Sequence, residues 1–313
     1  MKHVVSTGII NVDILYGDVK NIPIEGTEIF SKAFDIQLGG GAAATMINLS
    51  RLKVPTKLIT LLGKDTLSKL VEEKLQLYNL KYENIYKGSE MPLTVTSVLI
   101  TEKDRTFISY RNDIEITQKM KDRVYETCKD AKIVQMQEGY EDVYVQLKKE
   151  NPETIFVYDT GWTEHLSIES YKKYLEIADY FTPSISEALK ITNTNNIEDA
   201  SKVLHKYFKK VIIKLDNKGC FISDEKEDIV VPALGNINKI DSTGAGDAFL
   251  SGFIYGLYHE KNIIDCVIYG NISGGFCVKK LGCLTSYPTE EDYRFYYSEI
   301  KQKIDYSKNF INL

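Results

Sequence analysis

Residues 241–249 carry the side chains that could do chemistry on a phosphate group. They read Asp-Ser-Thr-Gly-Ala-Gly-Asp-Ala-Phe and lead into an apolar, helix-like stretch. A glycine turn that opens a helix binds anions, because unpaired N–H groups and the helix dipole both point at the incoming charge. An acid inside such a turn, Asp247, is expected if it takes a proton from a hydroxyl that attacks phosphorus. The structural alternative is that Asp247 only complements the helix dipole.

The segments around this motif predict an α/β fold that would hold it in place. Short apolar or β-branched runs alternate with helix-like segments, which indicates a mostly parallel sheet with helices on both faces. Residues 1–313 are therefore expected to form one domain, apart from an inserted sheet. The expected strands of the main sheet are residues 4–10, 57–62, 131–136, 154–158, 180–182 and 211–215.

Two segments, at about 14–38 and 92–112, are predicted to form the inserted sheet. They lack helical periodicity, and their β-branched and aromatic runs favour short antiparallel strands. A small sheet inserted at two places suggests a lid that closes over a substrate and excludes water. Its apolar residues exceed what one substrate needs, so we expect a symmetric homodimer through the lid. These residues are Ile22, Ile24, Ile29, Phe30, Val98, Ile100, Phe107 and Ile108.

Composition excludes several classes of function. A net charge of −5 over 313 residues argues against binding to nucleic acid or to a membrane surface, since both need a basic face. No apolar run approaches the ~18 residues of a membrane span, and the N-terminus leads into an expected strand, so we predict a cytoplasmic protein. The five cysteines and four histidines form no spacing typical of a disulfide framework or a zinc site.

The motif at 241–249 resembles the C-terminal signature of the ribokinase-like (PfkB) carbohydrate kinases. The resemblance extends from Gly8 to Pro288 and implies the ribokinase-like fold with a small β-sheet lid. It also implies an ATP- and Mg²⁺-dependent kinase that phosphorylates a hydroxymethyl group of a sugar or sugar-like molecule. In this family the last acid of the motif, here Asp247, is the catalytic base. The anion hole corresponds to Gly244, Ala245 and Gly246.

The resemblance places the sugar among residues from the first half of the chain. Asn11 and Asp13 follow the first expected strand, where an open α/β sheet binds ligands, and the family uses such an Asp to grip sugar hydroxyls. A turn-forming pair is the alternative for these two residues. The glycine-rich segment 39–45 looks like the N-terminal signature, with Gly40 and Gly41 near the substrate and Ala44 where many members have a sugar-binding Asn. Close packing of a helix on the sheet is the alternative there.

Two further residues complete the expected substrate set. Arg105 lies in the turn between the two strands of the second lid segment. Glu138 follows the expected strand 131–136, where it could contact the substrate or remain a solvated loop residue.

The second half of the chain is expected to bind the nucleotide. The resemblance implies contacts from Ala245 and Gly246, and a Lys at the end of the strand 211–215 could reach a phosphate of ATP or remain solvated. A turn and a small-residue helix would flank the nucleotide. The remaining candidates are Lys214, Asp216, Gly219 and Asn271.

Cation sites follow from the same resemblance. Glu187 keeps the acid of a family motif that orders water around Mg²⁺, although Ser184 replaces the Asn of that motif; a helix capping box is the alternative for this pair. A loop in the last quarter of the chain fits a site for a monovalent cation such as K⁺. Its residues are Asp241, Thr243, Gly282 and Ser286.

Two other functions remain open. A nucleoside kinase would use the same chemistry, with Tyr16, Phe30 and Tyr110 as an aromatic clamp for the base. A non-catalytic regulator that binds a sugar or nucleotide is suggested by the substitutions at Ala44 and Ser184 and a further one at Asp216. The complete motif at 241–249 argues against the regulator, and the sugar kinase is our prediction.

Overall fold

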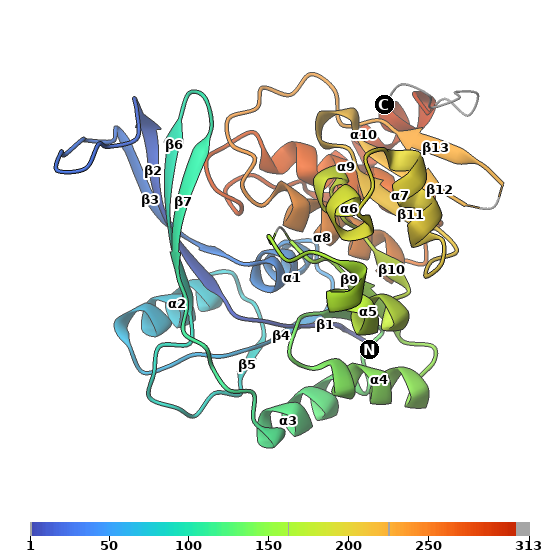
Figure 1. The fold of residues 1–313 in the computed structure, drawn as a ribbon, viewed down its shortest axis with the longest axis horizontal. Coiled ribbons are helices and arrows are strands. Elements are labelled where there is room, and N and C mark those ends of the chain that lie inside the picture. The colour runs from blue at the N-terminus through green and yellow to red at the C-terminus, as the bar shows by residue number, and fades with distance from the viewer. Residues whose placement is uncertain (1, 162, 225, 305–313) are drawn as a thin grey trace.

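A six-stranded parallel sheet forms the centre of the molecule, which was analysed as a computed structural model (Figure 1). The structure describes residues 2–161, 163–224 and 226–304. The strand order is β10-β9-β8-β1-β4-β5, and every neighbouring pair is parallel. The predicted fold class is confirmed. The strands are Val4–Thr7 (β1), Thr56–Thr60 (β4), Tyr82–Asn84 (β5), Ile133–Met136 (β8), Ile155–Tyr158 (β9) and Tyr180–Phe181 (β10).

Helices cover both faces of this sheet because successive strand residues point to opposite sides. Val4 belongs to the apolar core with α1, α8 and α9, whereas Val5 belongs to the core with α3, α4 and α5. Figure 1 shows these two helical layers. The helices are Gly41–Arg51 (α1), Thr66–Leu77 (α2), Gln118–Cys128 (α3), Glu141–Glu150 (α4), Ile168–Ile177 (α5), Ile185–Thr192 (α6), Ile197–Leu204 (α7), Ala245–Tyr258 (α8), Ile263–Cys277 (α9) and Glu290–Gln302 (α10).

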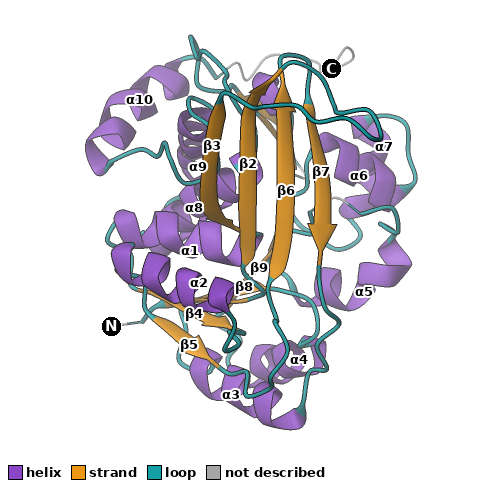
Figure 2. Cartoon of the chain, turned by 90° about the vertical axis from the view of Figure 1, so that its left-hand side faces the viewer, coloured by secondary structure: helices purple, strands orange, loops and turns teal. Residues whose placement is uncertain are grey.

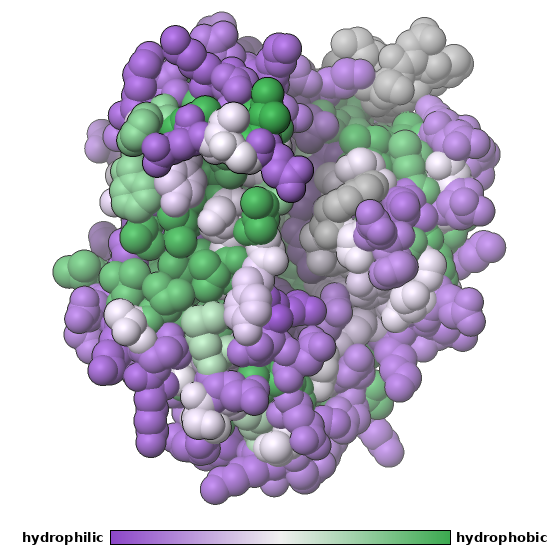
Figure 3. Space-filling view, turned by 60° about the vertical axis from the view of Figure 1, so that its left-hand side comes forward, coloured by the Kyte–Doolittle hydropathy of each residue, from purple (hydrophilic) through white to green (hydrophobic). Residues whose placement is uncertain are grey.

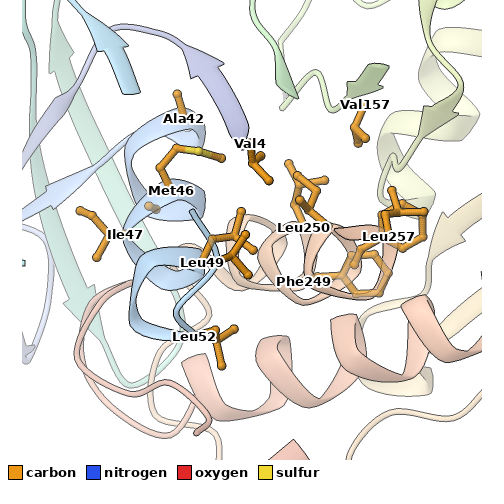
Figure 4. Packing of buried hydrophobic residues seen from close by; sticks show 14 of the residues in the cluster. Val4, Ala42, Met46, Ile47, Leu49, Leu52, Val157, Phe249, Leu250 and Leu257 are labelled. Carbon is orange, nitrogen blue, oxygen red and sulfur yellow. The ribbon is translucent and has the colours of Figure 1, made fainter. Parts of the chain in front are cut away.

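Helix α8, which carries Asp247, is enclosed by neighbouring helices on two sides. It packs beside α1, where Leu49 approaches Leu250 in the same core (Figure 4). On its other side it lies against α9 so closely that a Cβ built at Gly252 would meet the carbonyl oxygen of Tyr269 at 2.2 Å. Small residues therefore let α8 sit between two helices, which fixes the position of its N-terminus.

A four-stranded sheet stands beside the main body (Figure 2). Its order is β3-β2-β6-β7, and both outer pairs are antiparallel. The prediction of purely antiparallel strands is wrong for the central pair, because β2 and β6 leave the main body in the same direction and pair in parallel. The first expected strand also ends early, at Thr7, since Asn11 already begins β2. The strands are Asn11–Val19 (β2), Ala33–Gly39 (β3), Thr94–Thr101 (β6) and Arg105–Tyr110 (β7).

A three-stranded antiparallel sheet, β11-β12-β13, completes the fold. The segment 211–215 was expected in the parallel sheet but opens this hairpin instead. Gly219 makes the reversal possible with a φ of +107°, in the region that favours glycine. A parallel bridge between Ser184 and Lys214 still links the hairpin to the main sheet. The strands are Val211–Lys214 (β11), Cys220–Ser223 (β12) and Asp228–Val231 (β13), with a short 3₁₀ turn at Asp216–Lys218 (η1).

Among the described residues, no helix is both long and apolar enough to span a membrane. All five cysteines are free and buried, as small apolar side chains are.

Candidate active site

A cleft of about 1280 Å³ separates the four-stranded sheet from the start of α8 and the β11–β13 hairpins. The space-filling view shows the surface hollowed beside the small sheet (Figure 3). Side chains from β2, β6 and β7 line one wall, and the glycine turn before α8 lines the other. The cleft therefore collects the chemically interesting residues of both halves of the chain.

The start of α8 has the geometry of an anion site. Gly244 caps the helix with a φ of +73°, and a Cβ at this position would lie 2.1 Å from the Cβ of Cys283. The N–H of Ala245 donates to the carbonyl of Ser242 at 3.3 Å, whereas the N–H of Gly246 donates to no carbonyl among the described residues. Asp247 follows in the first turn. The turn thus presents a backbone donor and a carboxylate to the same cleft.

The glycine segment before α1 lies against two carboxylates. A Cβ built at Gly39 would lie 2.1 Å from Oδ2 of Asp13, and one built at Gly41 would lie 3.2 Å from Oδ1 of Asp247. Gly40, between them, has a φ of +90°. Any side chain at Gly39 would displace the Asp13 carboxylate, so the glycines bring both acids to one short piece of backbone.

Burial raises the pKa of both acids to about 6. The charge of Asp241 adds to this effect at Asp13. At Asp247 the ammonium of Lys214 lowers the pKa and opposes burial, while the charges of Asp13 and Glu187 raise it. Both groups are ionised at neutral pH, and Asp247 has the proton affinity expected of a general base.

Most of the residues predicted to bind the substrate line the cleft. Asn11, Asp13, Gly40 and Gly41 line it. Asp13 does so from within β2, not from the end of the first strand of the main sheet as expected.

Two expected substrate residues lie elsewhere. Ala44 is fully buried in the core that α1 shares with α8, and its methyl group does not reach the cleft. Glu138 is exposed and does not line the cleft, whereas the preceding residue, Gln137, does. Partial desolvation of the Glu138 carboxyl group raises its pKa, and Arg111 and Tyr171 oppose that rise.

Arg105 spans the cleft from the small sheet to the glycine turn. Its guanidinium donates to Oγ of Ser242 at 2.7 Å and lies 3.5 Å from Oδ1 of Asp241. Arg105 therefore ties β7 to the loop that begins the anion site.

The residues predicted to flank a nucleotide, Lys214, Asp216, Gly219 and Asn271, all line the cleft. The amide of Asn271 donates to the carbonyls of Val231 and Pro232, so this side chain holds the end of β13 in place.

Lys214 is held by an acid that the sequence analysis missed. Its ammonium donates to Oδ2 of Asp159 at 2.8 Å, and both side chains are nearly buried, with exposed fractions of 13% and 12%. Burial raises the pKa of Asp159 to about 7 against the opposing effect of Lys214. Asp159 directly follows β9, at the carboxyl edge of the parallel sheet. The rule that places ligands at this edge could have found it.

Glu187 serves as the capping box of α6 and also lines the cleft. Its Oε2 accepts from the N–H of Ser184 at 2.7 Å, and Oγ of Ser184 accepts from the N–H of Glu187. The alternative role of this pair is thus present, and it leaves the second oxygen of Glu187 for another partner.

The expected cation loop is brought together only in part. Asp241 accepts from the N–H and Oγ1 of Thr243 and from the N–H of Gly282, at 2.7 to 2.9 Å. Ser286 lines a separate small pocket beside Asn48. Within the described residues, no group of three or more His, Cys, Asp or Glu side chains could hold a metal ion.

The aromatic residues expected as a base clamp face away from the cleft or lie outside it. Tyr16 packs edge-on against Phe34, and neither it nor Phe30 nor Tyr110 lines the cleft. Among the described residues, Phe107 and Phe249 are the aromatic side chains that do.

The raised pKa of Asp247 predicts a stability effect with a defined sign. The folded pKa of about 6 exceeds the ordinary value of 3.8, so Asp247 lowers the free energy of unfolding as the pH rises from 3.8 to about 6, and the full loss is present above pH 6. We expect Asp247→Asn to raise the free energy of unfolding by about 1–3 kcal/mol at pH 8 and by much less at pH 4. Chemical denaturation at both pH values measures this.

Asp142→Asn provides the matched control. A hydrogen bond from Lys121 lowers the pKa of Asp142, so its loss should leave stability unchanged or reduce it at pH 8. A loss of stability in Asp247→Asn at pH 8 would contradict the electrostatic account.

Comparisons with known proteins agree with this geometry. A model of the family described as "pfkB family carbohydrate kinase" matches residues 1–290. A ribokinase of Staphylococcus aureus is 25% identical over 269 residues, which cover 81% of this chain and 86% of that protein. A 5-dehydro-2-deoxygluconokinase of Clostridium botulinum is 25% identical over 308 residues, which cover 87% of each protein.

Solved structures share the fold. A ribokinase from Giardia lamblia has a TM-score of 0.83 at 21% identity, covering 94% of this chain and 99% of that chain. An Arabidopsis thaliana ribokinase complexed with ribose and ATP has a TM-score of 0.80 at 23% identity, covering 95% and 99%. The family match extends over most of the chain and includes the acid-bearing turn at the start of α8. The chain therefore belongs to the pfkB family of carbohydrate kinases, phosphotransferases with an alcohol group as acceptor.

Proposed function

We propose that this carbohydrate kinase transfers the γ-phosphoryl group of ATP to a hydroxymethyl group of a sugar or sugar-like molecule. One observation carries the proposal: the Asp247 carboxylate lies in the first turn of α8 and, with Asp13, flanks the segment Gly39–Gly41. A hydroxyl held at the Asp13 end lies within reach of a base at the Asp247 end. The backbone donor of Gly246 is available for the phosphoryl group on the same side.

The residues divide the reaction between them. The carboxylate of Asp13 accepts hydrogen bonds from hydroxyl groups of the acceptor. The amide of Asn11 can both donate hydrogen bonds to these groups and accept them. Asp247 takes the proton of the reacting hydroxyl as its oxygen attacks the γ-phosphorus and the bond to ADP breaks. The N–H groups of Ala245 and Gly246 stabilise the charge on the transferring group, which is the main electrostatic contribution in such reactions.

Glu187 fits a role in binding Mg²⁺ through water. One of its carboxylate oxygens caps α6, and the side chain lines the cleft with 8% of its surface exposed. Mg²⁺ keeps several waters and is held largely by substrate phosphates, so it does not need a cage of protein ligands. When bound, the ion neutralises charge on the phosphates.

A sugar fits the acceptor end better than a nucleoside does. Besides Val98 and Phe107, that end is lined by amides, hydroxyls and the carboxylate of Asp13, which suit a polyol. Tyr16 and Tyr110 do not line it, so the clamp expected for a nucleoside base has no support. A non-catalytic regulator would not need the proton acceptor at Asp247.

Coupled ADP release across pentoses, hexoses, their phosphates and nucleosides tests the proposal. Turnover with at least one sugar is expected, whereas turnover with nucleosides alone would favour the nucleoside kinase.

Asp247→Asn should lower kcat by ~10²–10⁴-fold, the usual share of a positioned base.

Asp13→Ala is the contrasting variant, because it should chiefly raise KM for the sugar. An Asp247→Asn enzyme that turns over within about threefold of the parent would remove Asp247 from the mechanism.

We also propose that the loop of Asp241, Thr243 and Gly282 responds to K⁺. Asp241 is 4% exposed and lies beside the backbone of Gly282, while Arg105 provides a competing positive charge. We expect a higher rate in K⁺ than in a bulky organic cation at equal ionic strength, and a larger difference in Arg105→Gln. Equal rates in both salts, in both proteins, would remove the loop assignment and leave the kinase proposal intact.

The four-stranded sheet is proposed to act as the lid and as a dimer interface. Phe107, Val98 and Arg105 face the cleft, whereas Ile108 and Phe34 are turned away and exposed, at 69% and 61%. Figure 3 shows the apolar surface gathered on the side of the molecule that this sheet occupies. A small sheet with one bare apolar face is marginal unless that face is covered, and a second copy of the same face would cover it.

Light scattering at micromolar concentration tests the dimer, with an expected mass near twice 35.7 kDa. Ile108→Glu should give the monomer. Phe295→Glu on α10, at a side chain that is also 69% exposed, should leave the dimer intact. A parent mass near 35.7 kDa, with or without substrate, would show that the sheet covers its own cleft unaided.

A further inference from the structure

The ion pair of Asp159 and Lys214 lies at the point where the two ends of the cleft meet. Lys214 ends β11, and its backbone N–H donates to the carbonyl of Pro183 at 2.8 Å, which fixes the strand beside α6. Asp159 follows β9, a strand of the parallel sheet. The pair therefore joins the parallel sheet to the hairpin that begins with β11. Both residues line the cleft.

The ammonium of Lys214 lies against the anion site. A Cβ built at Gly246 would be 3.3 Å from Nζ of Lys214, which places this charge beside the first turn of α8. An ammonium has three N–H donors, and among the described residues Asp159 is the acceptor of one. Donors therefore remain for the oxygens of a phosphoryl group at Gly246.

Asp159 is itself incompletely paired. Its Oδ2 accepts from Lys214, whereas its Oδ1 is buried and has no hydrogen-bond partner among the described residues. A buried carboxylate oxygen without a donor costs stability, so its retention calls for a functional reason. The surrounding charges sharpen this point, because Glu187 and Asp247 both raise the pKa of Asp159.

We infer that Asp159 is a positioning residue that holds the ammonium of Lys214 over the anion site, where Lys214 acts on the transferring phosphoryl group. The inference rests on the proposed phosphoryl transfer and adds a residue to it. Without Asp159, the flexible four-carbon side chain of Lys214 could turn toward Glu187 or Asp247, whose charges also act on it. Asp159 thereby keeps this lysine apart from the base.

The effect of Asp159 should appear in kcat and not in nucleotide affinity. We expect Asp159→Asn to lower kcat about tenfold, while the affinity for a non-hydrolysable ATP analogue stays within about threefold of the parent. Lys214→Met should lower kcat about a hundredfold and weaken the analogue about tenfold, with ADP binding nearly unchanged, because the lysine acts at the γ position. The double variant should be no slower than Lys214→Met, since Asp159 acts through the lysine.

A second Lys–Asp ion pair, beside β9, serves as control. Lys148 pairs with Asp179, which also accepts from the backbone N–H of Phe156 in β9. Asp179→Asn removes a carboxylate beside the same strand but far from the anion site, and should keep kcat within about twofold. Thermal unfolding of each variant confirms that it is folded.

Several outcomes would overturn the inference. If Asp159→Asn lowered the affinity for the analogue and raised the Mg²⁺ concentration needed for half-maximal rate, Asp159 would be a metal ligand. Multiplicative losses in the double variant would mean that the two residues act independently. If a single variant did not fold, the double variant, which removes both charges together, would decide: a kcat within threefold of the parent would exclude any role for the pair.

Failure of the proposed function is a separate result. A parent protein that phosphorylates none of the tested acceptors would contradict the kinase proposal. Calorimetry would still test the pair through the difference between the ATP analogue and ADP in Lys214→Met. Equal losses for both nucleotides, or none, would show that Lys214 does not lie at the γ position.

Discussion

The close contact of two glycines, Gly39 and Gly41, with two carboxylates is the constraint on which the site depends. Gly39 leaves room for the Asp13 carboxylate, and Gly41 leaves room for the Asp247 carboxylate. Burial is the main cause of the raised pKa of both acids; the charge of Asp241 adds to it at Asp13, and the charge of Asp13 adds to it at Asp247. The fold tolerates this because α8 is fixed between α1 and α9 and cannot move away. Rigid packing thus maintains an arrangement that electrostatics alone would disperse.

The charged groups near the start of α8 shift the pKa values of the buried acids in opposite directions. Lys214 lowers the pKa of Asp247 and of Asp159, while Glu187 raises both. Arg105 supplies positive charge on the other side of the glycine turn, beside Asp241. Positive groups therefore stand on both sides of the turn that we propose as the phosphate site, and acids separate them from each other.

The sequence was sufficient for the fold class and for most of the cleft, because those features follow from short-range patterns. Alternating strands and helices specify the parallel sheet, and the turn at 241–249 identifies the start of α8. Asp13 was predicted at the end of the first strand of the main sheet, whereas the strand that carries it belongs to the small sheet. The parallel pairing of β2 with β6 depends on contacts about 80 residues apart, which local periodicity does not encode. Asp159 was missed because its importance lies in a lysine 55 residues away. Glu138 lies outside the cleft whereas the adjacent Gln137 lines it, and the loop after a strand has no periodicity that distinguishes the two positions.

Strands β2 and β3 have a mechanical consequence. Each runs without a long linker into the residues that flank the carboxylates: β2 contains Asp13, and β3 ends at Gly39, two residues before α1 begins. Asp247, in contrast, belongs to a helix embedded in the main body. Any rotation of the small sheet about its base would therefore change the distance between Asp13 and Asp247. The angle of the small sheet therefore also sets the distance between the two carboxylates.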